Sequence, residues 1–341
     1  MKISTRSFGT TRHGEPVHCI RLEHDSGITA EVLDYGATLR ALWVPVAGKT
    51  VQVCKGYETL AEYEAGTCYL GAVVGRCAGR IDGGHFVLNG TEYRLPQNQN
   101  GNHLHGGNEG FDRKVWGVQI LPRDRGVRFF RRSEDGEEGY PGAVEVSATY
   151  LFEEDGALTL RFDALALGDT ILSMTHHGYW NLEGAESTSV GGHRFFTPAD
   201  RFAAIRPDGV PTGELLPTEG TPFDFTAPAL LADRWDQPNE QLAAGGGFDH
   251  TFLVPGKGLR PMCRLECPEN GLSLTVSATL PGIHLYTGNF LEPVRRSAAA
   301  LEAQFIPDAP NHHQFPSVEL PKGKRWEHQI QYRFACQGES V

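Results

Sequence analysis

The chain of 341 residues carries 31 lysines and arginines against 42 aspartates and glutamates, so its formal net charge is −11. This negative balance argues against nucleic acid as a partner, because phosphates need a positive surface. Hydrophobic residues make up 40% of the chain, together with 41 glycines and 21 prolines. That composition is typical of a soluble globular protein rich in turns, and no segment approaches the ~18 consecutive apolar residues of a membrane span.

The compartment can be predicted from the first residues and from the cysteines. The opening stretch "MKISTRSFGTTRHGEP" has no apolar segment of the kind that secretory signals contain. The seven cysteines are odd in number and form no CxxC pair. Free thiols in a reducing compartment fit this pattern better than a disulfide framework does, so we expect a cytoplasmic protein.

Alternation of apolar and polar residues recurs along the first half of the chain and predicts strands. A short helical signal, "TLAEYEA" at 59–65, precedes "FVLNGTEYRL" at 86–95, which predicts a hairpin with Asn89-Gly90 as its turn. In "VEVSATYLF" at 144–152 every second residue faces one side, and the "EEDG" that follows is a turn into a second strand.

The second half continues the same pattern. "LSLTVSATL" at 272–280 and "WEHQIQYRF" at 326–334 alternate as strands do, whereas "AAALEAQ" at 298–304 is a weak helical signal. The proline-rich stretch at 207–228 is a candidate domain boundary, but its Phe and Leu content favours an ordered surface excursion. We therefore predict an all-β chain that forms a large antiparallel β-sandwich, a single domain over residues 1–341.

Residues 98–107 read "NQNGNHLHGG", a concentration of hydrogen-bonding groups and glycines that no packed core requires. On an extended segment His103 and His105 would lie on one face. Metal ligands can be spaced in this way, and so can groups that bind a sugar; the alternative is one surface and one core histidine. Gly106 and Gly107 favour a functional role, because glycines let a ligand approach the backbone closely.

A second histidine pair lies in "MTHHGYWNL" at 174–182. Because His176 and His177 are adjacent, a strand would point them to opposite sides and only one could enter a given pocket. Tyr179 could stack on the apolar face of a sugar or belong to the core. In "GRCAGRIDGG", Arg80 offers a planar donor fork for hydroxyls or a carboxylate, and a structural ion pair is the alternative.

Two carboxylates stand in apolar surroundings. Asp249 lies between Phe248 and Phe252 in "FDHTF", and Glu302 lies among Ala, Leu and Phe in "ALEAQFIPDAPN". Such surroundings disfavour the charged form and raise the pKa of an acid, which suits a group that transfers protons. For Glu302 the alternative is a solvated helix face.

Taken in chain order, these motifs resemble the aldose 1-epimerase (galactose mutarotase) family over nearly the whole chain. The motifs that carry the resemblance are "DYGATL" (34–39), "GRCAGRI" (75–81), "NHLHGGNEGFDRKVW" (102–116), "HHGYWNL" (176–182), "FDH" (248–250), "LYTGNFL" (285–291) and "LEAQFIPDAPN" (301–311). The resemblance implies a single-domain antiparallel β-sandwich, which agrees with the alternation.

The resemblance also implies roles for individual residues. Glu302 matches the family's general base, His177 its general acid and His105 its second pocket histidine. Arg80 and Asp249 match groups that hold sugar hydroxyls. The other substrate-binding residues that it implies are His284, Asn102 and Tyr179.

The implied reaction exchanges the α and β anomers of a free aldose through its open-chain form by acid and base catalysis. We expect no cofactor and no metal, a small aldose as the only partner, and a monomer or homodimer. Four positions depart from the family pattern, which usually has amides at His176 and His284, Asn at Gly79 and Thr at Ala303. These departures bear on which sugar is preferred.

Other classes of protein remain alternatives. A non-catalytic sugar-binding protein on the same fold would not need both Glu302 and His177. A glycoside hydrolase or lyase usually pairs two carboxylates, and only Asp249 could partner Glu302. A metal-binding protein lacks compact ligand spacing, and an epimerase of sugar phosphates would need more pocket cations. The sequence therefore predicts an isomerase.

Overall fold

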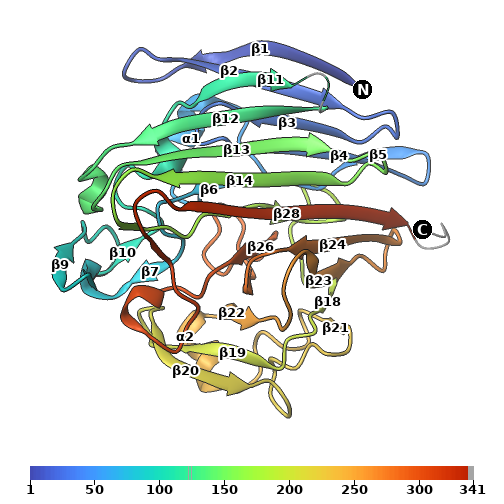
Figure 1. Cartoon of the computed structure of the whole chain (residues 1–341). Helices are drawn as coiled ribbons and strands as arrows, with labels where there is room; N and C mark the ends of the chain where they lie inside the picture. Colours follow the sequence, from blue (N-terminus) through green and yellow to red (C-terminus); the bar gives the residue numbers. More distant parts are fainter. Residues whose placement is uncertain (122, 124, 337–341) are drawn as a thin grey trace.

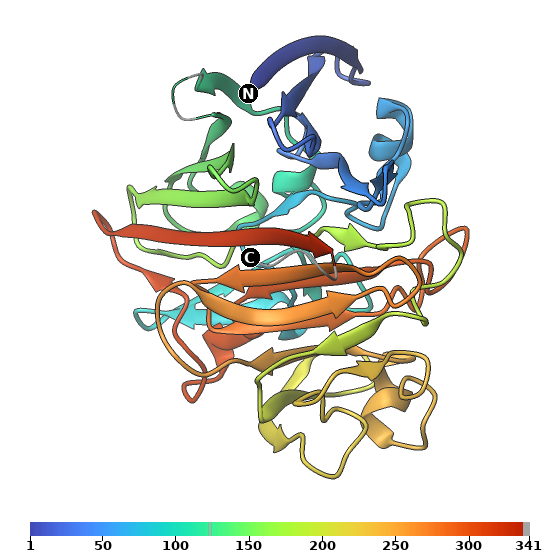
Figure 2. The same ribbon diagram turned by 90° about the vertical axis from the view of Figure 1, so that its right-hand side faces the viewer.

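Three antiparallel sheets build the molecule, in a computed structural model that describes residues 1–121, 123 and 125–336. Nine strands form the largest sheet, which runs through the middle of Figure 1, and sheets of five and six strands accompany it. Figure 2 shows the N-terminal strands above the large sheet and the segment around β19 and β20 below it. The predicted all-β antiparallel sandwich is confirmed.

The nine-stranded sheet has the order β11-β12-β13-β14-β28-β24-β23-β18-β21. Its strands are β11 (Gly117–Leu121), β12 (Gly126–Ser133), β13 (Val144–Phe152), β14 (Leu158–Ala166), β28 (Arg325–Cys336), β24 (Leu272–Ala278), β23 (Arg260–Glu266), β18 (Arg194–Phe196) and β21 (Ala229–Leu230). The five-stranded sheet consists of β1 (Lys2–Thr10), β2 (Pro16–Glu23), β3 (Thr29–Leu33), β4 (Leu39–Val46) and β5 (Lys49–Gln52).

The six-stranded sheet carries most of the polar residues discussed below. In spatial order its strands are β17 (Tyr179–Trp180), β26 (Ala299–Gln304), β25 (Gly282–Tyr286), β22 (Asp249–Leu253), β19 (Arg201–Ile205) and β20 (Pro211–Pro217). Short pairs join β7 (Arg80–Ile81) to β10 (His103–Leu104), β6 (Val73–Val74) to β16 (Thr175–His176), β8 (His85–Leu88) to β9 (Thr91–Arg94) and β15 (Thr170–Ile171) to β27 (Glu319–Leu320). In the described part of the chain the α-helices are α1 (Leu60–Ala65) and α2 (Glu240–Gly245), and four 3-10 turns of three residues each accompany them.

Most of the predicted elements are confirmed. The β8–β9 hairpin turns at Asn89 and Gly90, which have φ of 51° and 77° as such a turn requires. The β13–β14 hairpin and strands β24 and β28 also lie where alternation predicts them. Helix α1 begins with a capping box, in which Thr59 and Glu62 satisfy each other's backbone N–H groups.

One predicted element is wrong. Residues 298–304 do not form a helix, because Ala299–Gln304 is strand β26 in the interior of the six-stranded sheet. All six of its residues are buried, so the strand lacks the apolar–polar alternation that reveals a half-exposed strand. Helix α2, capped by Asn239, is an element that the sequence did not predict.

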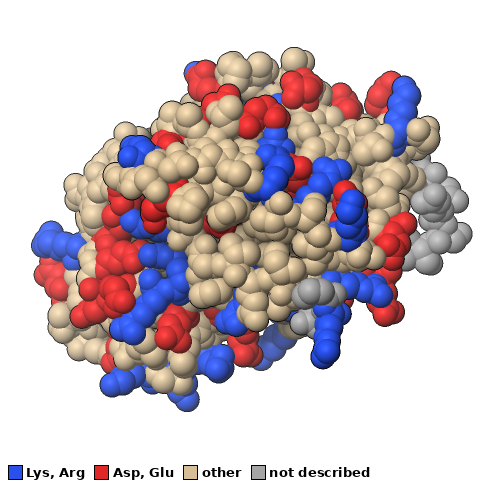
Figure 3. Space-filling view, turned by 90° about the horizontal axis from the view of Figure 1, so that it is seen from above, with Lys and Arg blue, Asp and Glu red and all other residues tan. Residues whose placement is uncertain are grey.

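Charged side chains of both signs are interspersed on the face shown in Figure 3. This distribution agrees with the charge being spread along the chain. Among the described residues, no helix is long and apolar enough to cross a membrane.

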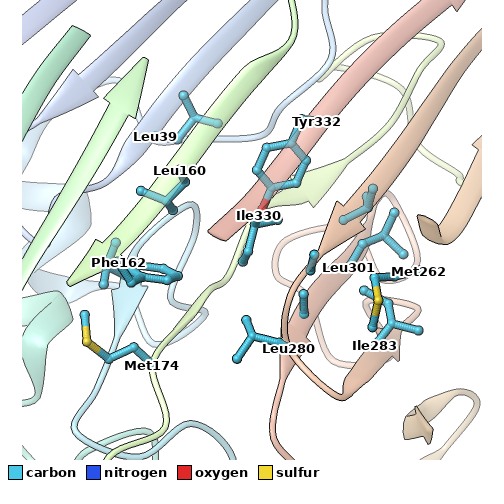
Figure 4. Packing of buried hydrophobic residues seen from close by; sticks show 14 of the residues in the cluster. Leu39, Leu160, Phe162, Met174, Met262, Leu280, Ile283, Leu301, Ile330 and Tyr332 are labelled. Atoms are coloured by element: carbon cyan, nitrogen blue, oxygen red, sulfur yellow. The ribbon is translucent and has the colours of Figure 1, made fainter. Parts of the chain in front are cut away.

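One large hydrophobic cluster joins the three sheets. It includes Phe162 of β14 and Tyr332 of β28 from the nine-stranded sheet, Leu39 from the five-stranded sheet and Leu301 from the six-stranded sheet. Figure 4 shows Phe162 and Tyr332 on strands next to the region that holds Leu301 and Ile283. The polar face of the six-stranded sheet is therefore supported from behind by packed apolar side chains.

Candidate active site

Neighbouring strands of the six-stranded sheet place a row of polar side chains on one face. Thr251 of β22 pairs with His284 of β25, and His284 pairs with Glu302 of β26. Asp249 lies two residues before Thr251, so its side chain points to the same face. These residues line a pocket of about 220 Å³. Loops from other parts of the fold form the rest of its lining.

Glu302 lies at the buried end of this row. Its side chain is only 2% exposed, and its Oε1 lies 3.5 Å from Nε2 of His177. Burial raises the pKa of Glu302 to about 7; the negative charge of Asp249 adds to the rise, and His284 and Arg80 oppose it. Oε2 is buried and has no hydrogen-bond partner among the described residues. The solvated helix face is thereby excluded, and Glu302 is a carboxyl group that can change protonation near neutral pH.

His177 is held by aromatic contacts. Its ring stacks between Tyr69 and Tyr179, with centroid distances of 5.8 Å and 4.9 Å and interplanar angles of 22° and 25°. Burial lowers the pKa of His177 to about 3, and the nearby His284 contributes to the decrease. In the ligand-free pocket the ring is therefore neutral beside Glu302, and its Nδ1 has no partner among the described residues.

His105 enters the pocket from the loop after β10. Its Nδ1 accepts a hydrogen bond of 3.2 Å from the backbone N–H of Gly79, so this bond assigns the hydrogen of the neutral ring to Nε2. The ring contacts Tyr69 and meets His177 edge-on at 5.2 Å. Burial lowers the pKa of His105 well below its ordinary value, and His177 and Arg80 add to the effect. His105 thus offers a neutral N–H donor.

The structure corrects the relative placement of the two histidines in this loop. His105 has a φ of 51°, so the segment is not extended there and the two side chains do not share a face. His103 points instead into the core, where it contacts Tyr140 Oη at 2.7 Å and the carbonyl of Pro96 at 2.8 Å. The glycine that follows makes this turn possible: a Cβ on Gly106 would lie 1.9 Å from the carbonyl oxygen of Gly75.

Arg80, Asp249 and His284 form a second polar group that lines the pocket. Nε of Arg80 donates to Gln99, and one terminal nitrogen lies 3.7 Å from Asp249 Oδ2. Nε2 of His284 contacts Asp249 Oδ1 at 2.8 Å, and its Nδ1 contacts Thr251 Oγ1 at 2.9 Å.

The pKa of Asp249 is lowered far below its usual range, which corrects the expectation from its apolar neighbours. Burial alone would raise this pKa, but the hydrogen bond from His284 and the charge of Arg80 outweigh it. Phe248 and Phe252 pack into the core and are fully buried, so they do not surround the carboxylate.

Two further predicted residues have different locations. Tyr179 lines the pocket and is 2% exposed. Asn102 does not line it: its Oδ1 accepts from the backbone N–H of Gly83, and its Nδ2 donates to Asp208. Asp208 is in turn bound by Arg206, so Asn102 braces the loops around the pocket.

Several lining residues were not predicted. Gln99 and Tyr286 lie inside the motifs quoted above, at 98–107 and 285–291, so those motifs could have identified them as pocket residues. Tyr69 has no such signal. It lines the pocket through a φ of 56°, a left-handed conformation that bulky residues rarely adopt, and it packs on both pocket histidines.

Only one group of side chains in the described part of the chain resembles a metal site, and it lies outside the pocket. Glu183, His193 and Cys267 bring one potential ligand atom each within 4.8 Å of one another. Nε2 of His193, however, accepts the backbone N–H of Leu182 at 2.9 Å, so Nδ1 carries the hydrogen of the neutral ring. The ring therefore has no lone pair left for a metal.

Comparisons with known proteins agree with this geometry. The family model described as aldose 1-epimerase matches residues 18–333. The chain is 36% identical to galactose mutarotase of Mus musculus, over 94% of this chain and 95% of that protein. It is also 36% identical to aldose 1-epimerase of Haemophilus influenzae, over 89% and 90%.

Solved structures give the same result. The galactose 1-epimerase of Lactobacillus acidophilus superposes with a TM-score of 0.87 at 25% identity, covering 98% of this chain and 99% of that one. An aldose epimerase homologue from C. elegans also has a TM-score of 0.87, at 29% identity, covering 93% and 98%.

Proposed function

The chain belongs to the aldose 1-epimerase family and is therefore an isomerase that interconverts the α and β anomers of an aldose, and from this premise we propose the roles of its pocket residues. Glu302 is the general base, and His177 is the general acid. The observation that supports this assignment is the buried contact of 3.5 Å between the two side chains at the pocket.

The reaction needs two proton transfers at atoms bonded to one carbon. Glu302 takes the proton of the anomeric hydroxyl while His177 gives a proton to the ring oxygen, and the ring opens to the aldehyde. After rotation about the C1–C2 bond, closure on the other face returns both protons. The pair holds one proton in total throughout, so the transfers balance. In the ligand-free pocket that proton lies on Glu302, because burial keeps His177 neutral, so the reaction requires its transfer to His177 across the 3.5 Å contact before Glu302 can act as the base.

The remaining polar residues orient the sugar. His105 donates from Nε2, and Arg80 and Asp249 bind hydroxyl groups. Tyr179 holds His177 by stacking and contacts the sugar at the pocket edge. A donor and acceptor set of this kind suits a neutral polyhydroxylated molecule.

We propose a free aldose of the galactose or glucose type as the substrate, which agrees with the names of the relatives. The pocket is lined by residues from Thr67 to Pro307, which supports a single domain over residues 1–341. The net charge of −11 supports the absence of a nucleic acid partner. Buried thiols such as Cys54, Cys77 and Cys263 support a reducing, cytoplasmic location. A monomer or homodimer is proposed.

Polarimetry tests the proposal. The purified chain should accelerate the change in optical rotation of freshly dissolved α-D-galactose and α-D-glucose, and dialysis against a chelator should leave the rate unchanged. Glu302→Gln should lower turnover by at least ~10²-fold, because it deletes one proton carrier. Glu145→Gln, at an exposed glutamate on β13, is the matched control. A wild-type rate equal to the spontaneous rate would overturn the proposal.

A further inference from the structure

His284 has no hydrogen-bonding atom left for a sugar. Nε2 contacts Asp249 Oδ1 at 2.8 Å, and Nδ1 contacts Thr251 Oγ1 at 2.9 Å. An imidazole has only these two polar atoms. The ring is 12% exposed, so it lines the pocket without offering a free donor or acceptor. This arrangement differs from the direct sugar contact that the family resemblance implied.

The hydrogen bond between His284 and Asp249 has only one possible direction. The Asp249 carboxylate can only accept, so Nε2 of His284 carries a hydrogen and donates it. Thr251 Oγ1 can donate to Nδ1 or accept from it, and Nε2 of Gln304 lies 3.5 Å from the same oxygen. Gln304, Thr251, His284 and Asp249 thus form one chain of hydrogen bonds across three neighbouring strands.

We infer that His284 is a positioning residue: it fixes the Asp249 carboxylate in one orientation and keeps it ionised beside Glu302. With Oδ1 held by His284, only Oδ2 is available, and it lies 3.7 Å from the Arg80 guanidinium. Asp249 therefore presents one defined acceptor to the pocket. The link to catalysis rests on the proposed role of Glu302 as the base, whereas the effect on Asp249 does not.

The consequence is a change in the titration of two carboxyl groups. Among the described residues, the titratable and charged groups that interact with Glu302 are His177, Tyr179, His284, Asp249, Arg80 and, from the core side, Tyr332. Burial raises the pKa of Glu302 to about 7 against the opposing effect of His284 and Arg80. Removal of His284 deletes one of these two opposing groups, so this pKa should rise. The pKa of Asp249 should also rise, because its hydrogen bond is lost.

The experiment is a carbon-13 NMR titration of the side-chain carboxyl groups in the ligand-free full chain, for wild type and His284→Leu, which leaves no donor to Asp249 at this position. We expect both Asp249 and Glu302 to titrate at higher pH in the variant, by on the order of one unit. The alkaline limb of kcat/KM should move in the same direction, because the Glu302–His177 pair must hold one proton and in the ligand-free pocket that proton titrates from Glu302. The ratio of kcat/KM between two aldoses that differ at one hydroxyl should change only together with these shifts, because Asp249 and not His284 binds the sugar hydroxyl.

Two further variants make the result specific. Thr251→Val preserves the side-chain shape and removes only the hydroxyl, so it should shift both titrations in the same direction by less. His328→Leu is the matched control, because His328 bonds to Thr279 in the same way at 3.0 Å but does not line the pocket. It should leave both titrations unchanged.

Unchanged titration of Asp249 and Glu302 in His284→Leu and Thr251→Val would overturn the inference. A changed ratio of kcat/KM between the two aldoses with unchanged titrations would also overturn it, because that result would mean that His284 contacts the sugar directly. The titration needs no turnover. A wild-type chain without activity would therefore reject the proposed function and still leave the effect of His284 measurable.

Discussion

Two segments of the molecule carry two histidines each, and each sends one to the pocket and the other to the core. His105 and His177 line the pocket. His103 and His176 are fully buried behind it. In both segments the same residue type therefore serves two purposes within a few positions of the chain.

The hydrogen bonds of the rings distinguish the two purposes. Each core histidine bonds to a buried tyrosine hydroxyl at 2.7 Å, His103 to Tyr140 and His176 to Tyr332. His177 in the pocket has no such partner and faces a carboxylate. His176 also keeps one nitrogen, Nε2, without a partner among the described residues, but it is fully buried and does not line the pocket. A histidine at the pocket is therefore available for chemistry, and one enclosed beside a tyrosine is part of the packing.

The backbone separates the two pairs in different ways. His176 and His177 are adjacent, and simple alternation sends them to opposite sides, as the sequence predicts. His103 and His105 would share a face in an extended segment, and the left-handed backbone at His105 separates them. Alternation therefore identifies a pocket residue only where the strand is regular.

Substitution of the adjacent pair should give the largest contrast. His177→Asn should lower turnover by ~10²–10⁴-fold, because it removes one of the two proton carriers. His176→Asn should change turnover little, but should reduce the free energy of unfolding by about 1–3 kcal/mol, since Tyr332 Oη loses its partner. Polarimetry gives the turnover numbers, and urea unfolding gives the stabilities.

Equal losses of turnover in both variants would contradict the division into pocket and core. Unfolding of His176→Asn under assay conditions would also lower its turnover, and the urea midpoint of that variant detects this. Assays well below the midpoint of each variant therefore provide the comparison.

Much of the site was predictable because its motifs occur in regular strands or in quoted loops. The structure brings Glu302, His177, His105, Arg80 and Asp249 to one pocket, as the resemblance implied. Strands β13, β14, β24 and β28 are also where alternation places them, since each has one face toward the core.

The misses have physical causes. Strand β26 is buried on both faces, so the segment that holds Glu302 has no alternation to reveal a strand. Asn102 lies beside the pocket histidines in sequence, but its amide is used by Gly83 and Asp208. Tyr69 reaches His177 only through a strained backbone conformation, which no local pattern predicts.

The turn after His105 can be broken with one methyl group. In Gly106→Ala the new Cβ would lie 1.9 Å from the carbonyl oxygen of Gly75, at a φ of 91° that alanine disfavours. We expect a loss of about 2–4 kcal/mol in the free energy of unfolding and a lower turnover, because His105 must move. Gly90→Ala is the control: Gly90 has a φ of 77°, but no atom lies within 4 Å of its Cβ position. It should cost only about 1 kcal/mol, and equal losses in urea unfolding would contradict the role of the close contact.

The smallest expected effect concerns the core histidine of the same loop. His103→Leu removes both hydrogen bonds of the ring and leaves Tyr140 Oη, in a side chain that is 1% exposed, without its histidine partner. We expect a loss of about 1–3 kcal/mol in the free energy of unfolding, with turnover per folded molecule preserved, because His103 does not line the pocket. In a Tyr140→Phe background the same substitution should cost less, because no hydroxyl then loses its histidine partner. Urea unfolding of the four proteins in this cycle measures the coupling. If His103→Leu lowers the free energy of unfolding equally in the wild-type and Tyr140→Phe backgrounds, the hydrogen bond between His103 and Tyr140 contributes nothing to stability. The carbonyl of Pro96 is then the contact that holds His103 in the core.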